Sequence, residues 1–111
     1  MCALLAVALA CGCEGDRSKL SDAELGLNAQ QAHGRRLFNT YCIACHPAYS
    51  SRGNKGPGLK GLCKKEYLPS GLTATDEHVE QAITRGRNMM PAFPQLSGED
   101  LADLVAYLRT L

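Results

Sequence analysis

The stretch Cys42–Ile43–Ala44–Cys45–His46 decides how this 111-residue sequence folds and what it can bind. Two cysteines lie three positions apart, and a histidine follows the second one directly. This pattern fits a redox-active dithiol, part of a zinc site, or the covalent attachment of a haem. Each alternative requires different residues elsewhere in the chain, so the surrounding sequence can distinguish among them.

A helical pattern leads into this motif. Leu37, Phe38, Tyr41 and Cys42 fall on one face of a helix that is predicted to begin near Ala29. A second helix is predicted after Thr75, and a third after Ser97, where Asp100 would complete an acidic variant of the capping box. Leu101, Leu104, Val105 and Leu108 give the third helix its apolar stripe.

The segment between these helices, residues 47–75, is rich in glycine and proline. A loop of this length is unusual in a compact domain unless it wraps something functional. No segment shows the sustained alternation that is typical of a strand. The sequence therefore predicts an all-α domain with about three main helices and long loops.

The predicted secondary structure helps to distinguish the three alternatives for the motif. A dithiol motif normally follows a strand, and no strand is predicted. Zinc could take Cys42, Cys45, His46 and Cys63, but two adjacent ligands on one small ion would strain the backbone. Haem attachment accounts for the two thiols and the histidine, and a methionine of the segment NMMPAF could be the second axial ligand.

The order of motifs resembles that of the small bacterial monohaem proteins among the class I c-type cytochromes. The resemblance covers residues 29–111. Its elements are Gly34 and Phe38 before the attachment motif, KGPGLKGL at Lys55–Leu62, GRNMMPAF at Gly86–Phe93, and LVAYLRTL at Leu104–Leu111. It implies the small cytochrome c fold, with the helices and loops wrapped around one covalently bound haem c.

The resemblance also implies roles for individual residues. Cys42 and Cys45 would form the thioethers to the haem, and His46 would bind the iron through Nε2. The family's methionine ligand directly precedes Pro-Ala-Phe, which selects Met90 over its neighbour Met89 as the second axial ligand.

Three further positions follow from the same resemblance. The Pro57 carbonyl would accept a hydrogen bond from the other ring nitrogen of the proximal histidine. Gly34 and Tyr107 match the residues at which the first and last helices of the family cross. At the position of Cys63 such proteins often carry an aromatic or aliphatic residue, so we expect a buried thiol there.

The first 13 residues differ from the rest of the chain. Twelve of them are apolar and none is charged, which predicts an export signal that is too short to span a membrane. Small residues before Cys13, and less favourably before Cys11, resemble a lipoprotein signal; ordinary cleavage that releases a soluble protein is the alternative. We expect residues 14–28 to be a flexible tether and residues 29–111 to be the cytochrome domain.

These observations predict a single-electron carrier without enzymatic activity. We expect a periplasmic monomer, held to a membrane at most by a lipid anchor, that exchanges electrons with transient partners such as a dehydrogenase, an oxidase or a reductase. Net charge is +1 with no long block of one sign, so nothing indicates binding to nucleic acid. The alternatives are a haem enzyme or ligand sensor with a labile sixth iron site, and a zinc-bound structural module.

The remaining polar candidates have simpler interpretations. His33 and His78 could be distal ligands, but solvated helix positions are the simpler expectation. Lys60, Lys64 and Lys65 could form a docking patch near the haem edge, but a solvated loop is the simpler expectation.

Overall fold

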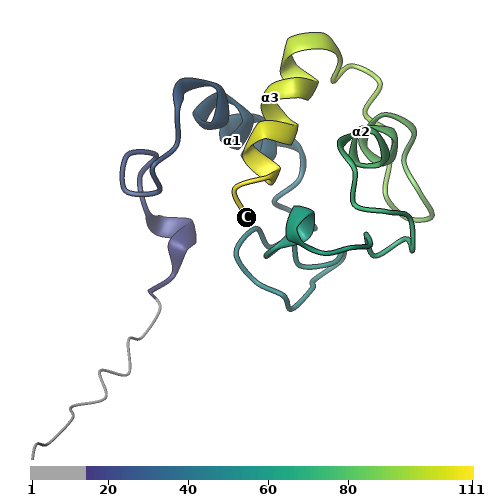
Figure 1. Cartoon of the computed structure of the whole chain (residues 1–111), viewed down its shortest axis with the longest axis horizontal. Coiled ribbons are helices and arrows are strands. Elements are labelled where there is room, and N and C mark those ends of the chain that lie inside the picture. The colour runs from purple at the N-terminus through teal and green to yellow at the C-terminus, as the bar shows by residue number, and fades with distance from the viewer. Residues whose placement is uncertain (1–14) are drawn as a thin grey trace, which may run out of the picture.

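A computed structural model describes residues 15–111 of the chain. Its helical elements, labelled in Figure 1 where there is room, are the short 3-10 helices η1 (Arg17–Lys19) and η2 (Leu62–Lys64) and the α-helices α1 (Ala29–Tyr41), α2 (Asp76–Arg85) and α3 (Gly98–Leu108). No β-strand occurs among these residues, which contain only two isolated bridges. The predicted all-α fold with three main helices is therefore confirmed.

The helix starts follow from local capping. The Asn28 side chain accepts a hydrogen bond from Gln31 N at 2.8 Å, and the Gln31 side chain accepts one from Asn28 N at 3.0 Å, so a complete capping box opens α1. Thr75 caps α2 as predicted. The capping box predicted for α3 is wrong, because Ser97 is the N-cap residue but its side chain makes no capping bond. The Asp100 carboxylate lies instead 3.8 Å from the ring of His33 on α1.

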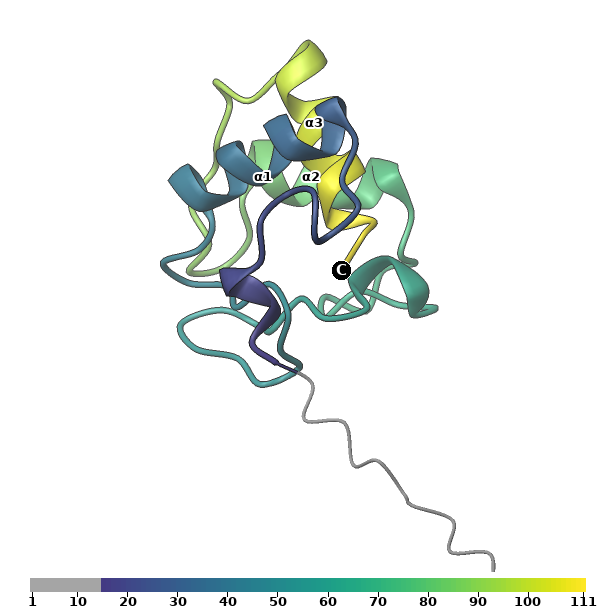
Figure 2. The same cartoon turned by 90° about the vertical axis from the view of Figure 1, so that its left-hand side faces the viewer.

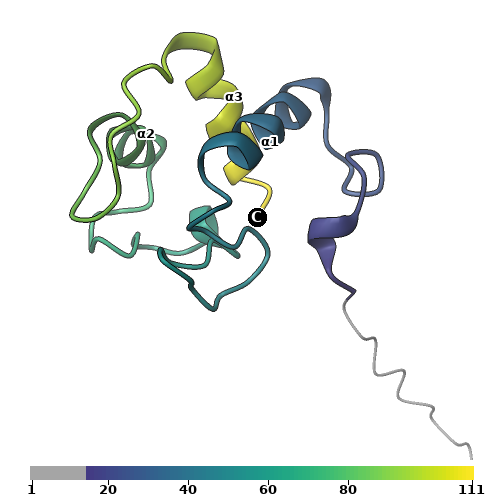
Figure 3. The same ribbon diagram turned by 180° about the vertical axis from the view of Figure 1, so that it is seen from behind.

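Helices α1 and α3 cross, as Figure 3 shows from behind, and they touch at Gly34. A Cβ atom added to Gly34 would lie 1.9 Å from the Asp103 carbonyl oxygen and 2.9 Å from Tyr107 Cβ. No side chain fits there, so the glycine interrupts the helix pattern in order to let two backbones touch. This crossing joins the first and last helices of the domain.

The core lies beneath this crossing. Phe38 and Tyr107 are almost completely buried, and their ring centroids are 5.5 Å apart. The Leu59 and Leu62 side chains from the long loop and Leu96 before α3 join the same cluster. Figure 2 shows the teal loop between α1 and α2 on the opposite side of the molecule from α1 and α3. The core therefore lies between two halves of the domain. We call α1, α2 and α3 the helical half and residues 47–75 the loop half.

The described part of the expected tether, residues 15–28, makes contacts with the domain. Arg35 Nη1 on α1 donates to Asp22 Oδ1 at 2.8 Å, and Leu27 packs against the core. The boundary expected at residue 29 stays a prediction, as does the export signal at residues 1–13, which lies outside the described residues together with Cys11 and Cys13. None of the helices in residues 15–111 has the length and apolar character needed to cross a bilayer.

Candidate functional site

The two cysteines of the motif follow the end of α1. Cys42 is the C-cap of the helix, and its carbonyl oxygen accepts hydrogen bonds from Cys45 N at 3.1 Å and from His46 N at 3.0 Å. One tight turn therefore carries both thiols and the imidazole. Among the described residues neither cysteine forms a disulfide, and both are half-buried.

The environment of these thiols argues against the dithiol alternative. Burial raises the pKa of Cys42 to about 11, and the nearby Cys45 adds to the shift. Redox-active dithiols depend on a thiol whose pKa is lowered, because the thiolate is the reactive species. The environment of the Cys42 thiol therefore favours its neutral form.

The His46 ring is held from two sides. Its Nδ1 lies 2.9 Å from the Pro57 carbonyl oxygen, so Nδ1 carries the proton and donates it, and Nε2 is the nitrogen that can bind a metal. Gly56 lies against the ring, since a Cβ there would come within 2.5 Å of His46 Cε1 and 2.9 Å of Nε2. Gly56 is therefore required because the His46 ring occupies the space that a side chain would need.

The two methionines occupy different environments. Arg87 and Met90 exchange backbone hydrogen bonds of 3.1 and 2.9 Å, which closes a tight turn with Asn88 in the left-handed region at φ 52°. Met89 at the tip of this turn is 94% exposed, whereas Met90 is half-buried and packs against the core. The Met89 side chain therefore points to solvent and fills no gap in the core. Met90 is the methionine that faces the interior of the protein.

The zinc alternative finds no support in the geometry. Across residues 15–111, no three His, Cys, Asp or Glu side chains gather closely enough to hold a metal ion. Cys63 is half-buried against the core, and burial is the main reason that its pKa is raised. It stays apart from the attachment motif.

The donor set that remains consists of two thiols and an imidazole on one loop and a thioether on another. This set fits the covalent attachment and axial ligation of a haem. The hydrogen bond of His46 Nδ1 leaves Nε2 available to bind iron, and the contact with Gly56 holds the His46 ring in place.

Both remaining histidines have protein partners. His33 Nδ1 lies 2.7 Å from Asp103 Oδ2, and this bond is the main reason that the pKa of the buried Asp103 carboxyl is lowered. His78 Nδ1 lies 2.8 Å from the Thr73 carbonyl oxygen. The expectation of solvated positions missed these bonds, because an acidic partner 70 residues away leaves no local pattern.

The comparisons with known proteins agree with this geometry. Residues 29–108 match the family described as "Cytochrome C oxidase, cbb3-type, subunit III". Cytochrome c6 of Leptolyngbya boryana is 35% identical over 81 residues, which is 72% of this chain and 91% of the relative. Cytochrome c6 of Picosynechococcus sp. is 33% identical over 84 residues, or 72% of each chain.

A larger relative also matches. Cytochrome c oxidase subunit 2 of Alkalihalophilus pseudofirmus is 35% identical over 85 residues, which is 70% of this chain but only 25% of the relative. The chain thus corresponds to about a quarter of that subunit and to most of the cytochrome c6 relatives. With its single attachment motif, the chain belongs to the small class I c-type cytochromes, and it is an electron carrier with one covalently bound haem c.

Proposed function

We propose that Cys42 and Cys45 form the thioether bonds to the haem, and that His46 Nε2 and the Met90 sulfur are the axial ligands of its iron. The hydrogen bond between His46 Nδ1 and the Pro57 carbonyl, 2.9 Å long, carries this proposal. A metal-binding histidine usually donates its other N–H to a carbonyl or carboxylate, which sets the tautomer and the ring orientation. When bound, the haem supplies the exchange of one electron between ferric and ferrous iron.

The chain tunes this exchange through its ligands. The Pro57 carbonyl increases the donor strength of His46 by drawing on its Nδ1 proton. A thioether is a soft, neutral ligand, so Met90 would favour ferrous iron and raise the reduction potential. With both axial positions filled by protein atoms, the iron has no open site for substrate, which supports a role without bond chemistry of its own.

We propose that the apolar core, against which Cys42 and Met90 pack, keeps water from the site. Leu59, Leu62 and Leu68 from the long loop and Val79 and Ile83 from α2 are all buried. A dry environment of this kind limits the reorganisation that accompanies a change of charge and also affects the potential.

The partners follow from the family description. Matches to a cbb3-type oxidase subunit family and to an oxidase subunit 2 support an oxidase as one transient electron-transfer partner. We also propose that the chain works as a periplasmic monomer after export, and that Cys13, or else Cys11, holds it to a membrane. The apolar leader and its small residues support this location.

The ligand assignment is tested with two matched variants. The exported holoprotein is prepared as the wild type, as Met90→Ala and as Met89→Ala, and spectra are recorded in both redox states. Met90→Ala should lose the weak far-red band of methionine bound to ferric iron, and its potential should fall. Met89→Ala changes a side chain that is 94% exposed and should leave both properties nearly intact.

Other outcomes identify the alternatives. If the two variants exchange their effects, Met89 is the ligand. Haem that is lost on acid–acetone extraction would exclude thioether bonds at Cys42 and Cys45. A wild-type ferric spectrum of the high-spin type would contradict methionine ligation and favour a haem enzyme or sensor.

A further inference from the structure

Positive charge collects at the loop end of the molecule. Residues 47–68 contain five Lys or Arg residues and a single Glu, whereas residues 76–109 contain three Arg and six Asp or Glu. A net charge of +1 therefore conceals a strong separation of charge between the loop half and the α2–α3 half. Such a separation orients a protein in front of a charged surface.

The segment that leads into the domain adds to this positive end. Arg17 and Lys19 of η1 are exposed, and an open cavity of about 660 Å³ places Arg17 beside Lys60 and Lys64 of the loop. Lys65 is the next residue and is also exposed. We define the basic face as Arg17, Lys19, Lys60, Lys64 and Lys65.

Only two acidic residues accompany these cations in the described segments 15–19 and 47–68. Asp16 lies 3.8 Å from Lys19 in an exposed pair, and Glu66 follows Lys65. Exposed pairs of this kind hold their partners weakly. Lys64 Nζ also donates to the Leu111 carbonyl oxygen at 2.9 Å, and in the helical half Arg109 and Asp76 form a pair at 2.8 Å.

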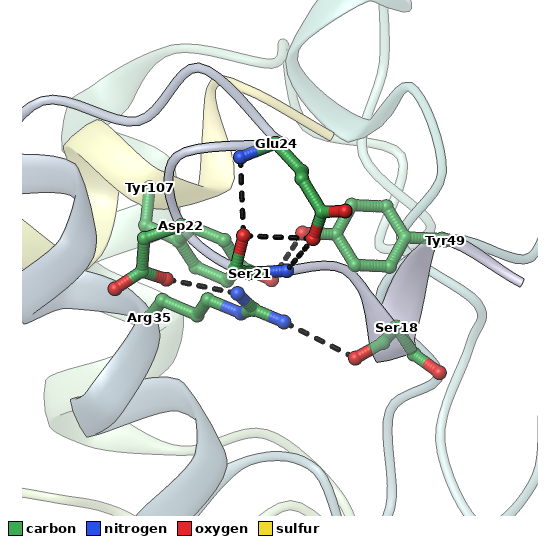
Figure 4. Close-up of polar contacts among 7 residues, drawn as sticks. All are labelled: Ser18, Ser21, Asp22, Glu24, Arg35, Tyr49 and Tyr107. Atoms are coloured by element: carbon green, nitrogen blue, oxygen red, sulfur yellow. Dashed lines mark hydrogen bonds and ion pairs between the residues drawn. The ribbon is translucent and has the colours of Figure 1, made fainter.

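Contacts with α1 and the loop hold η1 in place, as Figure 4 shows for Arg35 and its neighbours. The Arg35 guanidinium donates to Asp22 Oδ1 at 2.8 Å and to the Ser18 carbonyl oxygen at 3.1 Å. The Arg17 guanidinium lies over the Tyr49 ring, 5.4 Å from its centroid. The direction in which the chain enters the domain is therefore tied to the basic face.

The distance along the chain limits how far this face can lie from a lipid anchor. Residues 14 and 15 alone separate Cys13 from Asp16, the N-cap of η1. An extended chain advances about 3.3–3.6 Å per residue, so an acyl group on Cys13 would keep η1 within roughly 10 Å of the membrane surface. Attachment at Cys11 would extend this limit to roughly 18 Å.

We propose that the basic face binds the anionic phospholipid surface of a membrane and thereby sets the orientation of the domain on it. The negative surface potential of anionic lipid attracts lysine and arginine side chains. Each such side chain increases the binding constant on the order of fivefold. The face works with or without acylation, and it does not depend on which residues bind the iron.

The test compares two double variants that change the net charge equally. Lys60→Glu with Lys65→Glu alters the basic face, and Arg36→Glu with Arg85→Glu alters exposed arginines of α1 and α2. Full-chain holoproteins carry Cys11→Ser and Cys13→Ser to prevent acylation. Their binding is measured by sedimentation with vesicles of phosphatidylcholine alone and of phosphatidylcholine with phosphatidylglycerol.

We expect the parent protein to bind the anionic vesicles at least about tenfold better than the neutral ones at low salt, and to lose this preference at high salt. Because Lys→Glu reverses each charge, the basic-face variant should bind anionic vesicles more than about 25-fold more weakly, while the control variant keeps most of its affinity. Unchanged haem spectra would show that both variants are folded. Lys60→Gln with Lys65→Gln should give an intermediate loss.

Three results would overturn the proposal. Equal binding of the parent to anionic and neutral vesicles would exclude electrostatic attraction to lipid. Equal losses in the two double variants would make overall charge, rather than this face, responsible. Vesicle binding without a preference, together with slower electron exchange between the basic-face variant and an oxidase, would identify an acidic protein surface as the partner.

Discussion

The helix crossing and the ligand loops are built by different means. At the crossing, α1 and α3 touch through the backbone at Gly34, and His33 and Asp103 join the same two helices through their side chains. In the loops, His46 rests on Gly56 and bonds a carbonyl, and Met90 sits in a turn closed by its own backbone. Helix packing therefore dominates at the crossing, while backbone carbonyls and glycines determine where the proposed iron ligands His46 and Met90 lie.

Replacement of Gly34 should have the largest effect. In Gly34→Ala, a Cβ would lie 1.9 Å from the Asp103 carbonyl oxygen, and no flexible side chain can move aside. We expect the holoprotein to lose about 3 kcal/mol or more of its free energy of unfolding, despite the better helix propensity of alanine. Urea unfolding measures the loss. Gly15→Ala is the control, because nothing lies within 4 Å of that position, and equal behaviour of the two variants would show that the crossing is not close-packed.

Gly56→Ala tests the loop half in the same way. The added Cβ would come within 2.5 Å of the His46 ring and displace it from the Pro57 carbonyl. We expect a loss of about 1–3 kcal/mol together with a shifted reduction potential. A potential that stays constant while stability falls would show that the ring position does not control the iron. Gly34→Ala variants that still fold should have nearly the wild-type potential.

The Asp103 carboxylate provides a test that depends on pH. The hydrogen bond from His33 lowers its pKa in the folded state. Its contribution to stability is thus fully present above the ordinary carboxyl pKa of about 4, and it is lost as the pH falls through the lower pKa of the folded state. Asp103→Asn should lower the melting temperature by several degrees at neutral pH and flatten its decline in acid. Glu99→Gln, an exposed acid in the same helix, should keep the wild-type profile.

The smallest effect is expected where the two halves meet. Tyr107 on α3 donates a hydrogen bond to the Tyr49 hydroxyl in the loop at 3.0 Å. Tyr49→Phe removes this bond and should cost about 1 kcal/mol with little change in potential. A change in potential comparable to that of Gly56→Ala would mean that the helical half also positions the iron ligands.

The helices and the attachment motif could be read from the sequence because their signals are local. Capping residues, apolar stripes and the Cys-x-x-Cys-His spacing all lie within a few positions of one another. The role of Gly56 was missed, although the glycine beside Pro57 was visible, because only the folded loop brings the His46 ring against it. The His33–Asp103 pair was missed for a related reason, since it joins residues 70 positions apart.

Met89 and Met90 also differ in a way that short sequence patterns do not predict. The two side chains are chemically identical neighbours, so composition and spacing cannot rank them, and the resemblance to a family selected Met90. The turn between Arg87 and Met90 separates them by exposing one and half-burying the other. Burial depends on the whole fold, which short patterns do not contain.

The crossing of the first and last helices also determines when the domain can close during synthesis. Chains are made from the N-terminus, and α1 has no partner for its Gly34 surface until α3, which begins at Gly98, has been synthesised. The motif at residues 42–46 is complete much earlier. A growing chain therefore presents both thiols while its first helix is still unpaired. The thiols proposed to bind the haem are thus accessible on an open polypeptide before the domain closes.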